Sequence, residues 1–368
     1  MIRQTAAIFV DAYRELNARR LFWIALILSG LVVVAFALVG VSADQHVTIL
    51  GLETPIPLGM MGWTAEDLYK VLFVYFGINF WLAWLVTILA LVTTAGIFPD
   101  FIASGSIDLA LSKPIGRWRL FLTKYATGLL FVALQVFVFT GATFLVLGLR
   151  AGAWEPWLFL AVPVVVVFFS FLFCICTLLG LLTRSTIAAL LLTLLAWFGL
   201  FAINAVDEVL LGVGAQQQMS VEQLERQETQ LADRVERLDA EGTPAPQTTD
   251  RLEATREELE TARDDLRAVE RWQGRVVLAK TVLPKTSETI NLLRRWLIDL
   301  ADLPDVEEQA ANAQNGNDRS RGGPSAEASL RAARERDSRS PWWVIGTSLG
   351  FEAVVLLIAG WIFARRDF

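Results

Sequence analysis

The chain contains almost no cysteine or histidine. Its two cysteines, Cys174 and Cys176, lie together in an apolar run, and His46 is the single histidine among 368 residues. A disulfide framework requires several separated cysteines, and a structural zinc site requires four Cys or His ligands, so the sequence excludes both. We interpret the two cysteines as small apolar side chains and His46 as a solvated residue of a short loop.

Motifs for nucleotide and metal chemistry are also missing. The sequence has neither the Gly-x-x-x-x-Gly-Lys-Ser/Thr pattern of phosphate-binding loops nor the paired His/Glu pattern of metalloprotease helices. We therefore predict that this chain is not an enzyme and that it carries no catalytic residue, metal or cofactor of its own. The formal net charge of −6 at pH 7 gives no reason to expect a nucleic-acid partner.

Hydrophobic residues, in contrast, are abundant. They make up 54% of the chain, whereas charged residues make up 19%. Together with a mean hydropathy of +0.49, this composition is typical of a membrane protein. Most of the charged residues lie between positions 207 and 341, so the composition predicts a membrane protein with one polar insert.

Six apolar runs of about 20 residues predict transmembrane α-helices. These runs are residues 21–41, 71–98, 125–149, 157–182, 186–206 and 342–364. The single charged side chain inside them is Glu352, as expected from the cost of placing charge in hydrocarbon. The predicted fold class is an all-α, multi-pass membrane protein with six transmembrane helices. Residues 1–20 favour an amphipathic helix on the membrane surface, with a partly ordered tail as the alternative.

The distribution of basic residues predicts the orientation. With a cytoplasmic N-terminus, the short cytoplasmic segments carry eleven Lys and Arg residues and the opposite segments carry two, as the positive-inside rule requires. We therefore expect both termini in the cytoplasm, a location in the cell (inner) membrane, and the insert outside the cytoplasm. The predicted organisation is a transmembrane domain (1–206) with a coupling loop (99–124), an extracytoplasmic hairpin with a membrane-surface helix (207–304), a flexible tether (305–340), and the last transmembrane helix with a cytoplasmic tail (341–368).

The insert has the heptad spacing of paired helices. The apolar seam residues are Val221, Leu224, Leu231, Val235 and Leu238 before the helix-breaking segment 242–246, and Leu252, Leu259, Leu266 and Val269 after it. We expect an antiparallel coiled-coil hairpin, with pairing to another chain's helices as the alternative. Beyond it, Ile290, Leu293, Leu297 and Leu300 share one face of a predicted helix, which we place at the outer membrane surface or the outer mouth of the bundle.

Few polar side chains lie inside the predicted spans. Glu352, Asn79 and Gln135 are the candidate residues of a transport pathway, and Asn204 is a further polar residue. Glu352 either faces the bundle interior near a pathway or makes a structural hydrogen bond to a neighbouring helix, and the second interpretation is favoured. This poverty of membrane acids, together with the lack of an internal repeat, disfavours a secondary transporter.

The loop between the second and third predicted spans is the most informative stretch. Apolar residues around Ile107 and Leu111 predict a short helix that ends at Lys113-Pro114. A second helix with Arg117, Arg119 and Lys124 then leads into the membrane. Such an amphipathic elbow with a basic flank is suited to docking on a cytoplasmic protein, and an ordinary interfacial loop is the alternative.

These residues carry a family resemblance. The run Gly105-Ser-Ile-Asp-Leu-Ala-Leu-Ser-Lys-Pro-Ile-Gly-Arg117, with Lys124 seven positions on, resembles the signature of ABC type-2 permeases. In that family the stretch contacts the ATPase subunit. The resemblance implies ATPase-coupling roles for Asp100, Gly105, Ile107, Asp108, Leu111, Lys113, Pro114, Arg117 and Lys124. The insert is longer than the last outer loop of the family, so no role for it follows.

The resemblance implies the permease subunit of an ATP-binding-cassette exporter. We expect it to form a homodimer in membrane lipid and to bind a separate ATPase subunit, which would hold ATP and Mg. The large insert favours an extracytoplasmic protein partner. The alternative function is a non-transporting membrane anchor or scaffold that recruits such a partner through its hairpin. The transported substrate does not follow from the sequence.

Overall fold

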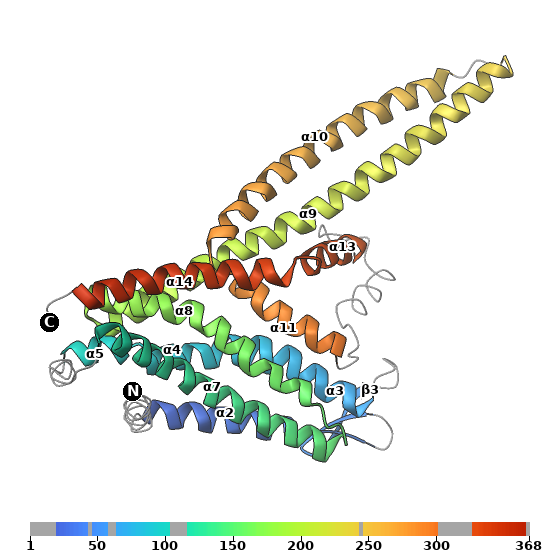
Figure 1. Cartoon of the computed structure of the whole chain (residues 1–368). Helices are drawn as coiled ribbons and strands as arrows, with labels where there is room; N and C mark the ends of the chain where they lie inside the picture. The colour runs from blue at the N-terminus through green and yellow to red at the C-terminus, as the bar shows by residue number, and fades with distance from the viewer. Residues whose placement is uncertain are drawn as a thin grey trace. The chain divides into compact units, whose positions relative to one another are not determined.

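The structure is a computed structural model that describes residues 20–42, 46–57, 64–103, 116–242, 246–300 and 326–365. Most of these residues are helical (Figure 1). The chain divides into two compact units. Unit 1 comprises Met1–Phe201, Leu283–Pro304 and Pro341–Phe368, and unit 2 comprises Ala202–Val282 and Asp305–Ser340. The predicted leader lies outside the described residues, except for its last residue.

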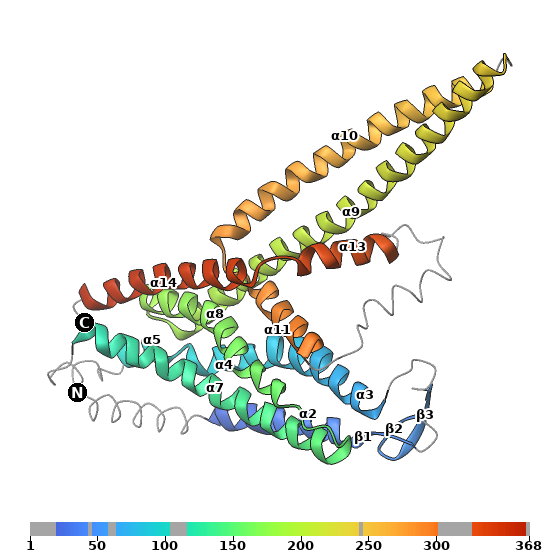
Figure 2. The same cartoon turned by 45° about the vertical axis from the view of Figure 1, so that its right-hand side comes forward.

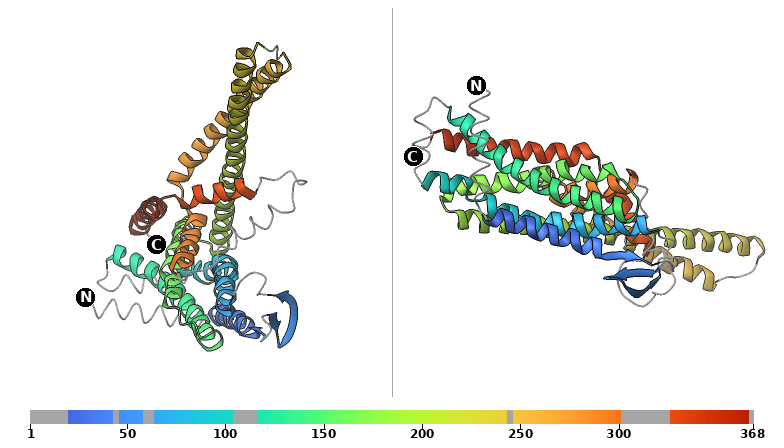
Figure 3. Two further views of the ribbon diagram at one scale, coloured as in Figure 1. Left: turned by 90° about the vertical axis from the view of Figure 1, so that its right-hand side faces the viewer. Right: turned by 90° about the horizontal axis from the view of Figure 1, so that it is seen from below.

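Unit 1 contains the membrane helices, which lie side by side as a bundle (Figure 3). Its helical segments are α2 (Arg20–Leu38), α3 (Ala65–Val71), the π-helix η2 (Leu72–Val86), α4 (Thr87–Thr94), α5 (Ile97–Ala103), α7 (Arg117–Arg150), the 3₁₀-helix η3 (Pro156–Leu160), α8 (Ala161–Thr183), the first part of α9 (Thr186–Ala240), α11 (Thr286–Leu300) and α14 (Pro341–Arg365). Within the described residues, five helices are long and apolar enough to cross a membrane. The chain is therefore a helical, multi-pass membrane protein.

The five helices correspond to the second to sixth predicted spans. They are Glu66–Ile102, Arg117–Arg150, Pro156–Thr183, Thr186–Ala240 and Pro341–Arg365. The helix that corresponds to the first predicted span, Phe22–Leu38, is apolar but shorter. Six spans therefore stay a prediction.

A small antiparallel sheet follows α2, which an all-α prediction missed. It consists of β1 (Val39–Val41), β2 (His46–Ile49) and β3 (Leu52–Pro57), in the order β1-β2-β3 (Figure 2). The turn between β2 and β3 is Leu50-Gly51, and both residues have positive φ values of 56° and 81°. Two residues of positive φ form a turn whose twist matches that of a hairpin. His46, expected in a loop, therefore begins a strand.

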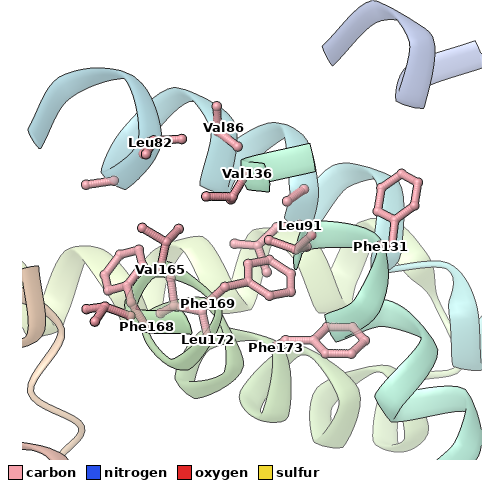
Figure 4. Close-up of a cluster of buried hydrophobic side chains, with 14 of the residues drawn as sticks. Leu82, Val86, Leu91, Phe131, Val136, Val165, Phe168, Phe169, Leu172 and Phe173 are labelled. Carbon is pink, nitrogen blue, oxygen red and sulfur yellow. The ribbon is translucent and has the colours of Figure 1, made fainter. Parts of the chain in front are cut away.

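The core of unit 1 is rich in phenylalanine. Phe168, Phe169 and Phe173 of α8 face side chains from η2, α4 and α7 (Figure 4). Several of these helices also carry large apolar side chains that are exposed, such as Leu31 of α2, Leu130 of α7 and Leu357 of α14. Among the five long helices the exposure is greatest on α9, since only 22% of the residues in its apolar stretch are buried.

The amphipathic helix α11 packs within unit 1. It contacts α8, η2, η3 and α14. The predicted face is confirmed where the side chains are described, since Ile290, Leu293 and Leu297 are part of the core. Next to its start, the backbone N–H of Lys285 donates to Ser348 Oγ of α14 (3.0 Å). The helix is thus held by the bundle itself.

Unit 2 contains two long antiparallel helices, the second part of α9 and α10 (Pro246–Val282). Ion pairs join them at Arg256–Glu228 (2.8 Å) and Arg263–Glu225 (2.7 Å). The nine predicted seam side chains are all buried or half-buried, and those that are fully buried are Val221, Leu252 and Leu259. The two helices pair within one chain, but most of the seam is covered only in part.

Part of the predicted tether is helical. Ala326–Asp337 form α13, whose Ala328 packs with Ala215 and Met219 of α9. Arg331 also binds Glu222 through both guanidinium nitrogens, at 2.8 and 3.2 Å. The structure thus has a docked helix within the segment predicted as a tether. Small alanines provide the contact, and the sequence offers no large aliphatic side chains to indicate it. Residues 305–325 lie outside the described residues.

Candidate functional site

The centre of the predicted coupling loop is not described. Gly105, Ile107, Asp108, Leu111, Lys113 and Pro114 all fall in the undescribed segment 104–115. The two helices that flank this segment, α5 and α7, are described, and they carry the three remaining predicted residues. We call their ends, with the start of α9 and the last turns of α14, the loop base.

Asp100 ties α5 to the start of α9. Its Oδ1 accepts a hydrogen bond from Thr186 Oγ1 at 3.0 Å. Next to it, Pro99 packs closely on α8, since a Cβ at Gly180 would lie 3.2 Å from its Cγ. The turn between α8 and α9 contains Arg184 with a positive φ of 52°, which ends α8. The predicted acid therefore positions the helix that precedes the loop.

Arg117 ties α7 to α14. Its Nη1 donates to the carbonyl oxygen of Ala364 at 2.9 Å. Carbonyls in the last turn of a helix have no partner within the helix, so a guanidinium is a suitable donor for one of them. One residue later, the Trp118 ring occupies the space beside Gly360, where any Cβ would overlap it.

Aromatic side chains complete the loop base. The rings of Phe98 (α5), Phe121 (α7) and Phe363 (α14) contact one another, with centroids 5.2 to 6.2 Å apart. Lys124 is buried, and its Nζ lies 4.8 Å from the centroid of the Phe101 ring, which is within the range of a cation–π interaction. The sequence analysis missed these aromatic residues, since nothing in the sequence distinguishes them from the apolar residues around them.

Glu352 is the centre of a second group, buried among three membrane helices. One carboxylate oxygen accepts a hydrogen bond from Tyr125 Oη of α7 at 2.8 Å, and the other accepts one from Ser170 Oγ of α8 at 2.7 Å. The Glu352 side chain lies on α14 and is only 7% exposed. Tyr125 is in turn stacked on Phe173, with centroids 5.0 Å apart. We call Tyr125, Ser170 and Glu352 the buried polar cluster.

This arrangement matches the favoured interpretation of Glu352, a hydrogen bond to a neighbouring helix. Its two partners were not predicted. The Ser170 hydroxyl also lies 2.8 Å from the carbonyl oxygen of Val167, and the Tyr125 hydroxyl lies 3.0 Å from the carbonyl oxygen of Ser170, so both partners have a second acceptor nearby. The cluster joins α7, α8 and α14 at a position one residue after Lys124 on α7, close in sequence to the loop base.

The other candidate pathway residues lie apart from this cluster. Gln135 of α7 is 1% exposed, and neither polar atom of its amide has a hydrogen-bond partner among the described residues. Asn79 is half-buried on η2. No hydrogen bond within the described part of the chain joins Glu352, Asn79 and Gln135. A shared pathway therefore stays a prediction, although an unsatisfied buried amide is costly and is of the kind that water or a ligand satisfies.

One motif in α14 has the spacing of a catalytic serine. Gly346-Thr-Ser-Leu-Gly350 matches the Gly-x-Ser-x-Gly pattern, which activates serine only on a sharp turn between a strand and a helix. Here all five residues are inside α14, and Ser348 Oγ donates to the carbonyl oxygen of Val344 at 2.7 Å. The geometry is that of a helical serine and not of a nucleophile.

The described residues hold no group of three or more His, Cys, Asp or Glu side chains that could bind a metal ion. Cys174 and Cys176 are both buried in α8, in agreement with their interpretation as apolar side chains. Comparison with protein-family models gives no match, and neither does comparison with curated proteins. The resemblance of residues 105–117 to ABC type-2 permeases therefore stays a prediction.

Proposed function

We propose that the chain is the permease subunit of an ABC exporter. Two copies would form the transmembrane pathway in the lipid bilayer, and a separate ATPase subunit with bound ATP and Mg would drive it. The proposal starts from the signature-like run Gly105–Arg117. The observation that supports it best is the loop base, because the helices on both sides of that run are fastened to other membrane helices.

A coupling element has to transmit force without yielding. If the loop were attached through mobile segments, movement of an ATPase would be absorbed locally and would not reach the bundle. The loop base instead links α5 to α9 through Asp100 and α7 to α14 through Arg117. A displacement of the loop would therefore shift four helices together, and the buried polar cluster would carry the shift to α8.

This mechanism gives the ATPase and the permease separate tasks. Nucleotide binding would close two ATPase subunits, and the loop would follow that movement. The loop base would convert it into a change in the packing of α5, α7, α9 and α14, which alternates access to the pathway. In this proposal the insert, residues 207–340, lies outside the cytoplasm and is available to a further protein partner.

Co-expression of the full chain with the ATPase encoded beside it tests the proposal. We expect co-purification, with ATP hydrolysed only by the ATPase subunit and the rate of hydrolysis stimulated by the permease. Charge reversal at Asp108 combined with Leu111→Ala should weaken the association, because both lie in the contacting run. Arg117→Ala should leave the association intact but reduce the stimulation of hydrolysis by the permease, because it loosens only the loop base.

Arg234→Ala is the matched control, since it removes the same charge from an exposed position in unit 2. It should change neither association nor stimulation. If no ATPase co-purifies with the unaltered chain, the exporter assignment is wrong, and the membrane anchor becomes the better interpretation. If Arg117→Ala stimulates hydrolysis as well as the unaltered chain does, the loop base has no coupling role.

A further inference from the structure

An exposed apolar stripe runs along α9 beyond the predicted end of its transmembrane segment. Exposed residues recur every three or four positions, which places them on one face of the helix. They are Ile187, Leu191, Leu195, Phe198, Ala202, Val206, Val209 and Val213. The last two lie past residue 206, where the sequence predicted the span to end, and Val209 is still 64% exposed.

The stripe is longer than the hydrocarbon core. From residue 187 to residue 213 a helix rises about 39 Å, whereas the hydrocarbon is about 30 Å thick and the bilayer with its headgroups about 40 to 45 Å. An untilted helix would therefore extend its stripe through the headgroup layer. A tilt of about 40°, the upper end of the usual range, would bring the whole stripe into the hydrocarbon. In both cases lipid reaches Val209 and Val213.

Charged residues at the same level lie on the opposite face of α9 and are paired. Asp207 binds Lys280 of α10 at 2.7 Å and Arg339 at 2.8 Å, and its side chain is buried. Glu208 binds Arg336 at 3.1 Å. Asp207 is thus paired and turned toward the protein, which is compatible with a lipid environment on the other side of α9. Glu208 is paired as well, but its side chain is 71% exposed.

The end of α10 also carries exposed apolar side chains, on the side that points away from α9. Trp272, Leu278 and Val282 are all exposed, with Leu278 at 72%. Leu278 and Val282, four positions apart, share one side of the helix, and Trp272 lies about 120° around the helix from Leu278. The two sets of exposed side chains are at the same level within unit 2, because Lys280 pairs with Asp207 and a Cβ at Gly214 would lie 3.6 Å from Val269 Cγ1. Trp272 is thus level with the end of the stripe on α9.

The residues on α10 are arranged as they are at a membrane boundary. The aliphatic side chains Leu278 and Val282 are at the level of Asp207, nearer the span. Trp272 is farther along, and the guanidinium carbon of Arg275 lies 4.9 Å from the centroid of its ring. Tryptophan is enriched at membrane–water interfaces, and arginine buries its stem in apolar surroundings while its charge reaches polar groups.

We infer that the base of the hairpin, residues 206–213 of α9 and 272–282 of α10, is immersed in the interfacial layer of the lipid bilayer. Val206, Val209, Leu278 and Val282 contact acyl chains, and Trp272 with Arg275 lies among phosphate headgroups. Lipid is the occupant because the exposed stripe continues without a break from the membrane span on the same helix. This inference does not depend on the exporter function.

The consequence is mechanical. A hairpin whose base is free in water could swing about the residues at the end of the span. If both helices of the base have apolar side chains in lipid, the hairpin is held at the membrane by two helices. The ion pairs of Asp207 keep these two helices together.

Site-directed fluorescence on the full chain tests the inference. Cysteine is introduced singly at Val209 or Leu278, labelled with an environment-sensitive dye, and the protein is reconstituted into phosphatidylcholine vesicles. Gln227 and Glu260, exposed residues of the same two helices in the polar part of the hairpin, are the control positions. We expect blue-shifted emission from labels at 209 and 278, and quenching of this emission when spin-labelled lipid is added. Labels at the control positions should not be quenched.

Two results would overturn the inference. Labels at 209 and 278 that respond to aqueous iodide and ignore spin-labelled lipid would place the base in water. Blue-shifted emission without quenching by lipid would mean that a protein surface, such as a second copy of this chain, covers the stripe.

The depth order gives a separate test. A label at Arg271, which leaves Trp272 and Arg275 intact, should be quenched more by a headgroup spin label than by one deep in the acyl chain. A label at Val282 should show the reverse preference. If both labels prefer the same probe, α10 does not cross the interface as inferred.

Discussion

The buried polar cluster allows a quantitative prediction. Glu352 accepts hydrogen bonds from Tyr125 at 2.8 Å and from Ser170 at 2.7 Å. Hydrogen bonds between membrane helices contribute about 0.6 kcal/mol on average and about 1.7 kcal/mol at most. Glu352→Ala removes two of them and leaves a space in a packed interior, so we expect a loss of about 1 to 4 kcal/mol in the free energy of unfolding.

Glu352→Gln separates hydrogen bonding from charge. The amide keeps the shape of the side chain and two polar atoms, of which one can accept from Ser170 and the other can donate to Tyr125. We therefore expect a loss below about 1 kcal/mol. Leu357→Ala is the control for truncation on the same helix, because Leu357 is exposed toward lipid, and it should cost little.

The pairing itself is measured by a double-mutant cycle. Tyr125→Phe removes the hydroxyl, and its combination with Glu352→Ala should cost less than the sum of the two single changes by about 0.6 to 1.7 kcal/mol. The assay is unfolding of the purified full chain in mixed micelles, followed by helical circular dichroism. Additive costs, or a Glu352→Gln variant as unstable as Glu352→Ala, would refute the role of the cluster as a hydrogen-bonded tie.

Two further predictions concern packing and pH. Gly128→Ala should lower the free energy of unfolding by about 1 to 3 kcal/mol, because the new Cβ would lie 2.6 Å from the ring of buried Phe173. The control Gly141→Ala, on the same helix, should be neutral or stabilising, since its Cβ would meet nothing nearer than 4.0 Å. Equal unfolding midpoints for the two variants would contradict this prediction. The hydrogen bond from Arg331 holds the pKa of Glu222 below its ordinary value. The pair therefore stabilises the docked α13 fully at any pH above the ordinary pKa of glutamate. This stabilisation is lost as the pH falls through the lowered pKa. Hydrogen exchange of residues 326–337, corrected for intrinsic rates, should show weaker protection at acid pH, and Arg331→Ala should lower the protection at neutral pH; a pH-independent pattern would reject the pairing.

The loop base shows what a sequence motif can predict and what it cannot. The signature-like run suggested that Asp100, Arg117 and Lys124 act in coupling. It gave no indication that Arg117 would reach Ala364, 247 positions away in sequence. The aromatic contacts of Phe98, Phe121 and Phe363 were not predicted either, because nothing in the sequence distinguishes these residues from the apolar residues around them. A residue type and its spacing identify a candidate, and the partners come only from the fold.

The polar insert shows the same limit in another form. Heptad spacing predicted two helices, and the structure has them as α9 and α10. The docking of α13 depends on Ala328 fitting against Ala215 and Met219, and small side chains give no periodic hydrophobic signal. The Leu50-Gly51 hairpin was likewise missed, since its strands are only three to six residues long.

The sequence by itself determined that the chain is a helical, multi-pass membrane protein, and it located the five long apolar helices, because hydropathy and helical periodicity are properties of neighbouring residues. The tertiary structure decided which helices touch. The bond from Tyr125 to Glu352 joins residues 227 positions apart, and the pair of Asp207 with Lys280 joins residues 73 positions apart. Such contacts depend on which helices pack against one another. Lipid tails are as apolar as the helix faces, so hydropathy alone does not select one packing arrangement among the possible ones.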